Sequence, residues 1–462
     1  MTKNMTVGNP AKLIFFFTIP LLIGNLFQQF YSMADTLIVG RTIGVDALAA
    51  VGCTGSISFL ILGFAQGLTS GLSIITAQRF GAQDMDGIRK SFAHSAVISL
   101  GVTVVLTAIA LPATMPFLRL LQTPEEIIQD SYSYLSVIYG GIIASVLFNL
   151  FSNILRALGD SRTPLIFLVI ACILNIALDF GFILIFQSGV AGAAWATVIS
   201  QLFSALLCFV YMMKRFPVLH LRREDWRFSW EEASRHLRLA LPMAFQSSII
   251  SIGAIVLQFT LNGLGANAVA AYSASQKIDQ LASQPVNSFG VTMATFAAQN
   301  YGAGKFDRIR KGARQCCAMS LSFAVVIGLV NILFGYQLST LFVGPEEVEV
   351  LNLSHTYLSI TGCAYWVLAL LFILRFTLQG LGQSFAPTIA GIMELIMRSF
   401  AAIVLSIFFG FAGVCTASPL AWVGSCIPLS IAYLLTMRRV FAQQKNSPQF
   451  LPGGIEKAEE NA

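Results

Sequence analysis

Two acidic residues lie in stretches of the chain that are otherwise apolar enough for the interior of a bilayer. Asp35 is the one acid in "LFQQFYSMADTLIVG" (residues 26–40), and Asp179 follows Asn175 by four residues in "ACILNIALDFGF". Residues four apart share one face of a helix, so Asn175 and Asp179 can offer an amide and a carboxylate to the same proton or hard cation. Gln28 precedes Asp35 by seven residues and lies on its face. A charge at the centre of a membrane helix costs about 2.5 to 3.5 kcal/mol, so both acids require a reason to be there.

The two acids can influence each other's protonation if the helices that carry them are in contact. Desolvation and like-charge repulsion then favour a proton on one carboxylate near neutral pH, an arrangement suited to ion coupling. The plainer alternative is that each acid only satisfies a polar partner between helices. Pro20 lies fifteen residues before Asp35 and lacks a backbone donor, so we expect a bend in that helix.

A second group of charged residues interrupts the apolar segments of the C-terminal part of the chain. Glu394 and Arg398 are four apart in "GIMELIMRSF", which predicts an ion pair within one helix. Lys277 and Asp279 are two apart and do not face each other, and "SQKIDQLASQP" indicates a water-filled or broken stretch. These four residues form a possible second polar site, and the sequence leaves open whether it is functional or structural.

The elements that carry these residues are membrane helices. The chain has 462 residues, of which 56% are apolar and 11% charged, and its mean hydropathy is +0.75. This composition excludes a soluble domain with a solvated face. A helix needs about 20 apolar residues to span a bilayer, and the segments are too long for the strands of a barrel. Twelve such segments are centred near residues 26, 62, 104, 143, 176, 201, 251, 283, 328, 365, 398 and 427.

An internal repeat divides these segments into two sets of six. "AQRFGAQDMDGIRK" at 77–90 returns as "AQNYGAGKFDRIRK" at 298–311, and "LGDSRTP" at 158–164 returns as "LGQSFAP" at 381–387. Six spans separate matching points, so both halves enter the membrane from the same side. We therefore predict an all-α polytopic membrane protein of twelve transmembrane helices, in two parallel-repeat six-helix bundles around a central cavity. The expected division is 1–213 for the first bundle, 214–238 for a cytoplasmic linker, 239–440 for the second bundle and 441–462 for a cytoplasmic tail.

The basic residues predict the orientation. With both termini in the cytoplasm, the segments on the inner side hold 24 of the 28 Lys and Arg residues, Arg375 among them. The net charge of +6 reflects this asymmetry, so we expect no nucleic-acid partner. The eight cysteines form no metal-binding pattern, and signatures of nucleotide-binding loops and hydrolases are absent, so we expect no enzyme and no cofactor. Transport would then have to be driven by an ion gradient.

The chain resembles the multidrug and toxic compound extrusion (MATE) transporters of bacteria. The resemblance rests on the two parallel halves, on "IPLLIGNLFQQFYSMADTLIVGRTIGVDALAAVG", on "AQRFGAQD" with its repeat "AQNYGAGK", and on "RALGDSRTPL". It implies alternating access in the inner membrane and export of organic cations or amphipathic drugs in exchange for H⁺ or Na⁺. Within the family, the spacings from Pro20 to Asp35 and from Asn175 to Asp179 mark the cation site of the first bundle.

The resemblance adds further members to that site. Gln28 and Thr197 match its glutamine and threonine, and Asn153 best fits an asparagine of the fourth helix, with Asn149 one turn away as the alternative. Oxygen atoms of Asp35, Asp179, Asn175 and Thr197 could hold Na⁺ as well as a proton. One branch of the family has a glutamate where this chain has Ile250, so we expect the coupling site in the first bundle alone.

Two other functions compete with this expectation. A lipid-linked saccharide flippase of the same superfamily would share the fold, but it should line its cavity with several basic residues for pyrophosphate. A membrane-embedded transferase would need a constellation of catalytic loop residues that the sequence lacks. We expect a small amphipathic or cationic substrate, the lipid bilayer as surroundings, and a monomer.

Overall fold

The computed structural model describes residues 4–446, so residues 447–462 of the expected tail lie outside the described residues. Within that range the chain is helical throughout and has no strand. Its α-helices are α1 (Pro10–Thr42), α2 (Val45–Gly81), α3 (Met85–Leu120), α4 (Glu125–Gly140), α5 (Ile142–Ala157), α6 (Arg162–Phe180), α7 (Gly189–Arg215), α8 (Trp230–Asn262), α9 (Ala266–Gly302), α10 (Phe306–Ser339), α11 (Val348–Gly380), α12 (Phe385–Phe400), α13 (Ser406–Cys415) and α14 (Ala417–Asn446). Short π-helices follow α6 (η1, Gly181–Ile185) and α12 (η4, Ala401–Leu405).

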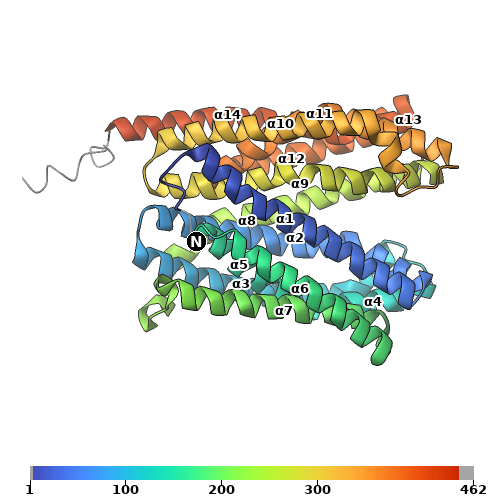
Figure 1. Cartoon of the computed structure of the whole chain (residues 1–462), viewed down its shortest axis with the longest axis horizontal. Helices are drawn as coiled ribbons and strands as arrows, with labels where there is room; N and C mark the ends of the chain where they lie inside the picture. Colours follow the sequence, from blue (N-terminus) through green and yellow to red (C-terminus); the bar gives the residue numbers. More distant parts are fainter. Residues whose placement is uncertain (1–3, 447–462) are drawn as a thin grey trace, which may run out of the picture.

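Most of these helices are long and apolar enough to cross a membrane. Among the described residues, ten spans meet that condition singly, and α4 with α5 forms an eleventh that bends by 47°. α9 corresponds to the predicted segment near residue 283. It lies parallel to the other spans (Figure 1), although its polar residues make it less apolar than they are. The prediction of an all-helical, multi-pass membrane protein is confirmed.

The bend between α4 and α5 has a steric cause. It falls at Gly140 and Gly141, where the chain crosses α7 closely. A Cβ atom on Gly141 would lie 2.4 Å from a methyl carbon of Val198, so only glycine permits this approach. Because glycine also weakens a helix interior, the close crossing and the bend occur together.

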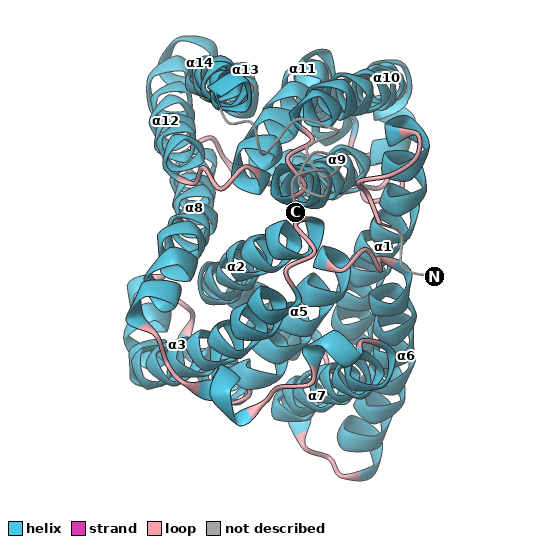
Figure 2. Cartoon of the chain, turned by 90° about the vertical axis from the view of Figure 1, so that its left-hand side faces the viewer, coloured by secondary structure: helices cyan, strands magenta, loops and turns pink. Residues whose placement is uncertain are grey.

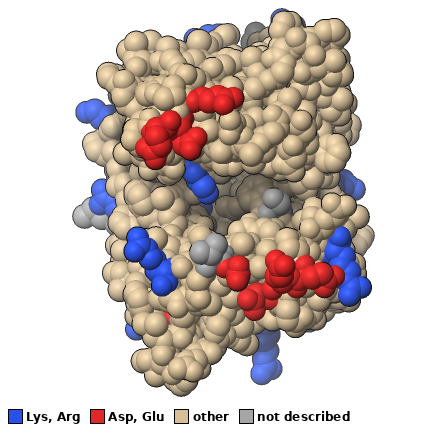
Figure 3. Space-filling model, turned by 90° about the vertical axis from the view of Figure 1, so that its right-hand side faces the viewer, with Lys and Arg blue, Asp and Glu red and all other residues tan. Residues whose placement is uncertain are grey.

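The helices form two groups that correspond to the repeat. Figure 2 looks onto the end that carries both termini, which we call the terminal end, and shows α10, α11, α12 and α14 on one side and α3, α5, α6 and α7 on the other. Figure 3 looks onto the opposite end, where the surface is hollowed between the two groups and acidic side chains stand on both sides of the hollow. The exposed acids of this end are in the first turns of α4 and α11 and in the loop before α11: Glu125, Glu126, Glu346, Glu347 and Glu349. We call this end the cleft end.

At the terminal end the two halves are closed against each other along a seam between α2 and helices α8 and α9. A Cβ atom on Gly71 would lie 2.5 Å from Ala240 Cα, and one on Gly67 would lie 2.5 Å from the Met243 carbonyl oxygen. Small residues let helix backbones approach in this way, which provides van der Waals contact where lipid supplies no hydrophobic driving force. The seam therefore seals one end of the molecule while the other end is open.

Two glutamines of the repeated motif bridge this seam in a reciprocal way. Gln78 of the first half donates its amide to the Gly380 carbonyl oxygen of the second half at 2.9 Å. Gln299 of the second half donates to the Ala157 carbonyl oxygen of the first half at 2.8 Å. Both acceptors are at helix ends, where carbonyl groups lack partners within the helix. Each copy of the repeated motif thus supplies a hydrogen-bond donor for a helix-end carbonyl group of the other half.

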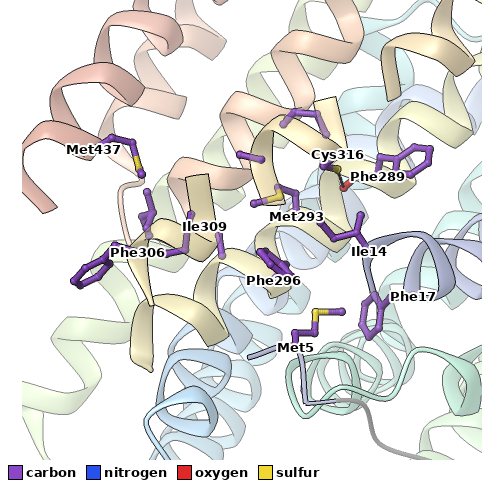
Figure 4. Packing of buried hydrophobic residues seen from close by; sticks show 14 of the residues in the cluster. Met5, Ile14, Phe17, Phe289, Met293, Phe296, Phe306, Ile309, Cys316 and Met437 are labelled. Carbon is purple, nitrogen blue, oxygen red and sulfur yellow. Dashed lines mark hydrogen bonds between the residues drawn. The ribbon is translucent and has the colours of Figure 1, made fainter. Parts of the chain in front are cut away.

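Helix α1 belongs to both halves. Its beginning packs into an apolar cluster of the second half, in which Ile14 and Phe17 lie near Phe289, Met293 and Phe296 (Figure 4). Farther along, Thr18 donates to Thr292 at 2.8 Å and Asn25 donates to Ser288 at 3.0 Å, both on α9. The remainder of α1 packs on α6 of the first half, as its slanted course in Figure 1 indicates. Pro20 lies inside α1, between Thr18 and Asn25, which both bond to α9.

The connection between the halves is shorter than the expected linker. α7 ends at Arg215 and α8 begins at Trp230, capped by Ser229, so residues 230–238 already form helix. Between them lie two short 3₁₀ turns, η2 (Pro217–Leu219) and η3 (Arg223–Trp226). The connection runs over the terminal end, where Arg79 of α2 forms an ion pair with Glu232 of α8.

Candidate functional site

The structure brings the two predicted acids together. The carboxyl groups of Asp35 on α1 and Asp179 on α6 lie close enough to share a proton. Asp35 is 6% exposed and Asp179 is fully buried. The Oδ1 atom of each is buried without a hydrogen-bond partner among the described residues. The pair therefore retains acceptor capacity that no protein donor uses.

Asn175 and Thr197 complete this group, as the sequence predicted. In the amide orientation that satisfies both neighbours, Asn175 donates to Asp179 Oδ2 at 3.2 Å and accepts from the Thr197 backbone N–H at 3.3 Å. Thr197 lies on α7, and its hydroxyl accepts a hydrogen bond of 3.1 Å from the Tyr31 hydroxyl. Helices α1, α6 and α7 thus meet at one polar group. We call Asp35, Asp179, Asn175, Thr197 and Tyr31 the acid group.

A cavity inside the first half lies next to the acid group. It has about 880 Å³ of empty space, counting the region where it opens. Tyr31 lines this cavity, whereas the two acids lie behind Tyr31 and are not among the lining residues. The other polar lining comes from Asn25 and Gln28 of α1, Gln66 of α2, Ser145, Asn149, Ser152 and Arg156 of α5, Ser161 before α6, and Ser200, Gln201 and Ser204 of α7. We call it the first-half cavity.

The remaining predicted members of the site lie outside the acid group. Gln28 faces the first-half cavity and is exposed there, and Pro20 lines the part of the cavity nearer the terminal end. Asn153 does not join the acids, because its face of α5 is turned toward α2, where its amide donates to Thr69 Oγ1 at 3.4 Å. The alternative, Asn149, lines the cavity.

The acid group has the chemistry of a site for a proton or a hard cation. Two buried carboxylates in contact cannot both be ionised without a compensating positive charge, because both desolvation and repulsion oppose it. The unpartnered oxygen atoms of Asp35 and Asp179, with the oxygen atoms of Asn175 and Thr197 nearby, are the ligands that Na⁺ or a proton would use. Among the described residues, no three His, Cys, Asp or Glu side chains come together as a transition metal would require.

The second half holds a different kind of polar cluster. Glu394 and Arg398 form the predicted ion pair within α12 at 2.9 Å. The other carboxylate oxygen of Glu394 accepts from Arg375 of α11 at 2.8 Å, and all three side chains are less than one tenth exposed. Arg375, which the sequence places among the basic residues of the inner side, lies near the end of α11 at the terminal end. Its buried charge shares the Glu394 carboxylate with Arg398.

Asp279 and Lys277 have separate surroundings. Asp279 accepts a hydrogen bond of 2.5 Å from the Tyr365 hydroxyl, to which Asn331 donates at 3.0 Å. Lys277 is exposed. Of the two alternatives for this stretch, water-filled or broken, a broken helix is excluded, because α9 is continuous through both residues. Of the four charged residues predicted as a second polar site, Glu394 and Arg398 belong to an arginine–glutamate network, Asp279 pairs with Tyr365, and Lys277 lies apart from both groups.

Two contributors to these groups could not be found from charge alone. Tyr31 lies four residues before Asp35, so its place on the same face was readable from the sequence, but a tyrosine in an apolar segment is usually a packing residue. Tyr365 had no such signal. Its contact with Asp279 depends on how α9 and α11 cross.

Comparison with known proteins identifies the family. A model of the MatE family matches residues 20–180 and again residues 242–404, one match in each half. The chain belongs to the MATE family. It is therefore a multi-pass membrane transporter, and MATE proteins are transporters, not enzymes. The double match also agrees with the internal repeat.

This MATE protein is similar to several named relatives and solved structures. The probable multidrug resistance protein YoeA of Bacillus subtilis is 30% identical over 389 residues, which cover 82% of this chain and 83% of YoeA. The FAD transporter of Shewanella oneidensis is 26% identical over 394 residues, covering 82% and 84% of the two chains. A solved structure described as the outward-facing conformation of a multidrug resistance MATE family transporter is 25% identical, has a TM-score of 0.87, and is matched over 96% of this chain and 99% of its own. Relatives of this family that are named for multidrug resistance or export support a role in drug efflux.

Proposed function

We propose that this MATE protein is an antiporter that exports amphipathic or cationic organic compounds from the bacterial cytoplasm in exchange for entering H⁺ or Na⁺. The observation that carries the proposal is the buried contact between Asp35 and Asp179, in which each carboxylate keeps one unpartnered oxygen. A site of this kind binds a cation from outside more readily than it remains empty.

The acid group can communicate with the cavity through Tyr31. Its hydroxyl donates to Thr197, whose backbone N–H contacts Asn175, and Asn175 in turn contacts Asp179. Tyr31 also lines the first-half cavity. When a cation neutralises the acids, the hydrogen bonds of Asn175 and Thr197 adjust and Tyr31 changes the shape of the cavity wall. The affinity for a bound compound falls as a result.

The distribution of basic residues supports an outward-facing state. The positive-inside rule assigns the terminal end to the cytoplasm, because this end carries most of the Lys and Arg residues. The hollow at the cleft end then faces outward, while the seam closes the cytoplasmic side (Figure 3). Export requires the seam to open and the cleft end to close in the other state. Helix α1 contacts both halves, so a bend at Pro20 during this movement would link it to the acid group.

The flippase alternative receives less support. A carrier of lipid-linked saccharides needs several basic side chains for pyrophosphate, and Arg156 is the one basic residue that lines the first-half cavity in the described part of the chain. Arg375 and Arg398 share the Glu394 carboxylate and are buried. Their charge is not available to a lipid phosphate in this state.

The decisive experiment measures efflux of ethidium from proteoliposomes with an imposed gradient of pH or of Na⁺. We expect one of the two gradients to drive efflux by the wild type and neither to do so for Asp35→Asn. Asp130→Asn, which removes an exposed acid of α4, is the matched control and should transport normally. Efflux by Asp35→Asn at the wild-type rate would disprove the coupling site, and wild-type protein that responds to neither gradient would disprove the antiport.

A further inference from the structure

Arg156, at the end of α5, differs from the other buried or half-buried arginines of the chain. Four of them face carboxylates: Arg79 pairs with Glu232, Arg89 with Asp86 and Asp225, and Arg375 and Arg398 with Glu394. Arg308 donates instead to backbone carbonyl oxygens of the N-terminal segment. Arg156 has no ion pair with any described residue. Its Nη1 donates to Asn153 Oδ1 at 3.1 Å, and its Nε is buried without a partner.

An uncompensated charge away from bulk water is costly unless something else neutralises it. Arg156 lines the first-half cavity, and it also lines the narrow space between the halves at the seam. Along α1 the cavity reaches from Pro20 to Tyr31, a distance of roughly 16 Å at 1.5 Å per residue. The guanidinium group lies toward the terminal end of the cavity, and the acid group lies next to Tyr31 at its other end.

The second half shows that this position does not require a charge. In the repeat register, "RALGDS" aligns with "QGLGQS", so Gln379 takes the place of Arg156. Gln379 is 2% exposed and donates to Gln246 Oε1 at 3.0 Å, which closes that place with a neutral pair. A basic residue in the last turn of α5 interacts favourably with the helix dipole, but α11 has no basic residue in its last turn. The charge of Arg156 is thus specific to the half that contains the cavity.

We propose that Arg156 is the binding site for an anionic group, a carboxylate or a phosphate, on the exported compound. The preferred substrates are then amphipathic compounds that carry an acid as well as a cationic or aromatic part. A guanidinium group binds either anion through two parallel hydrogen bonds. This inference rests on the proposed export function and specifies its substrate class.

The test uses two dyes that differ in one acidic group. Rhodamine 110 carries a free carboxylate, and rhodamine 123 is its methyl ester. Their dissociation constants are measured by fluorescence anisotropy with the protein in lipid nanodiscs. We expect the wild type to bind the carboxylate dye about tenfold more tightly than the ester. Arg156→Gln introduces the residue type that the second half has at this position, and it should bring the ratio of the two dissociation constants near one. Arg156→Lys should retain part of the preference, because it keeps the charge but not the fork of donors. Arg162→Gln removes an exposed charge at the beginning of α6, just across the loop from Arg156, and should leave the ratio unchanged.

Three results would overturn the proposal. The wild type could lack a preference for the carboxylate dye, Arg156→Gln could keep the wild-type ratio, or Arg162→Gln could lower the ratio as much as Arg156→Gln does. If the affinities for both dyes fall equally in Arg156→Gln, the ratio is kept and the residue is structural. Failure of the export function is recognised separately, because gradient-driven efflux of the ester dye does not depend on a carboxylate contact.

Discussion

Gly81 of the first half touches the backbone of Gln299 in the second half so closely that a Cβ atom on Gly81 would lie 1.9 Å from the Gln299 carbonyl oxygen. The related glycine of the second half, Gly302, has the same relation to the Gln78 carbonyl oxygen at 1.8 Å. Neither backbone oxygen can rotate away as a side chain would. The closed seam therefore depends on the absence of a methyl group at these two positions.

Gly81→Ala should shift the protein away from the state with the closed seam. Forcing a methyl group into a packed contact costs typically 1 to 3 kcal/mol, which corresponds to at least about a fivefold change in the ratio of closed to open molecules. The readout is the rate at which maleimide labels a cysteine introduced at Ser73, a 9%-exposed residue of the seam, followed by mass spectrometry of that peptide. Gly101→Ala is the control, since a Cβ atom there meets nothing within 4 Å. Equal labelling rates in the two variants would contradict the role of the seam.

The coupling cation should stabilise the wild type and not Asp35→Asn. A ligand that binds only the folded protein raises the melting temperature as its concentration increases. We expect the Tm in detergent to rise by several degrees either on addition of Na⁺ at constant pH or on lowering the pH in Na⁺-free buffer, and this difference identifies the ion. In Asp35→Asn neither treatment should have this effect, because the pair no longer has two acids. Asp130→Asn should behave as the wild type, and a full response of Asp35→Asn would place the cation elsewhere.

Removal of Glu394 should destabilise the second half much more than removal of Arg398. Glu394→Gln leaves both Arg375 and Arg398 buried without a counter-charge, and breaking such a cluster costs about 3 to 5 kcal/mol. Arg398→Gln leaves Arg375 and Glu394 as a neutral pair, so its effect should be smaller. Thermal unfolding in detergent gives the order of the two variants, and the double variant should be less destabilised than Glu394→Gln alone. The opposite order would show that the network is not held by charge.

The hydroxyl group of Thr197 should be required for rapid transport. Thr197→Val leaves the Tyr31 hydroxyl without its acceptor, a loss of about 1 to 3 kcal/mol for a buried group, and we expect roughly a tenfold lower rate of dye efflux. Thr197→Ser keeps the hydroxyl and should restore most of the rate. If Thr197→Val transports as fast as the wild type, Tyr31 does not connect the acid group to the cavity.

The sequence predicted those parts of the site that depend on position along a single helix. The spacing of Asn175 and Asp179, and that of Glu394 and Arg398, gave contacts that the structure contains. The two halves followed from the repeat. The meeting of Asp35 with Asp179 was a conditional prediction, and it holds because α1 packs on α6.

Relations between helices were harder to predict, because they depend on how each helix is rotated and where it crosses its neighbour. Asn153 and Asn149 are four residues apart, yet one faces Thr69 of α2 and the other lines the first-half cavity. Arg375 was expected among the basic residues of the inner side, but its burial could not be predicted, because the carboxylate that allows it lies on a separate helix.

The reciprocal bonds of Gln78 and Gln299 have a consequence for the origin of the chain. Each half supplies the same donor, and each supplies the helix-end carbonyl that the other donor needs. A two-fold homodimer has this property, because its contact is isologous and residue i of one subunit meets residue j of the other while j meets i. A single six-helix polypeptide could thus have formed the same closed contact with a copy of itself before the two were fused. After fusion each copy could diverge at positions outside this contact. At such positions the first half has paired acids, and the second half has arginines that share a glutamate.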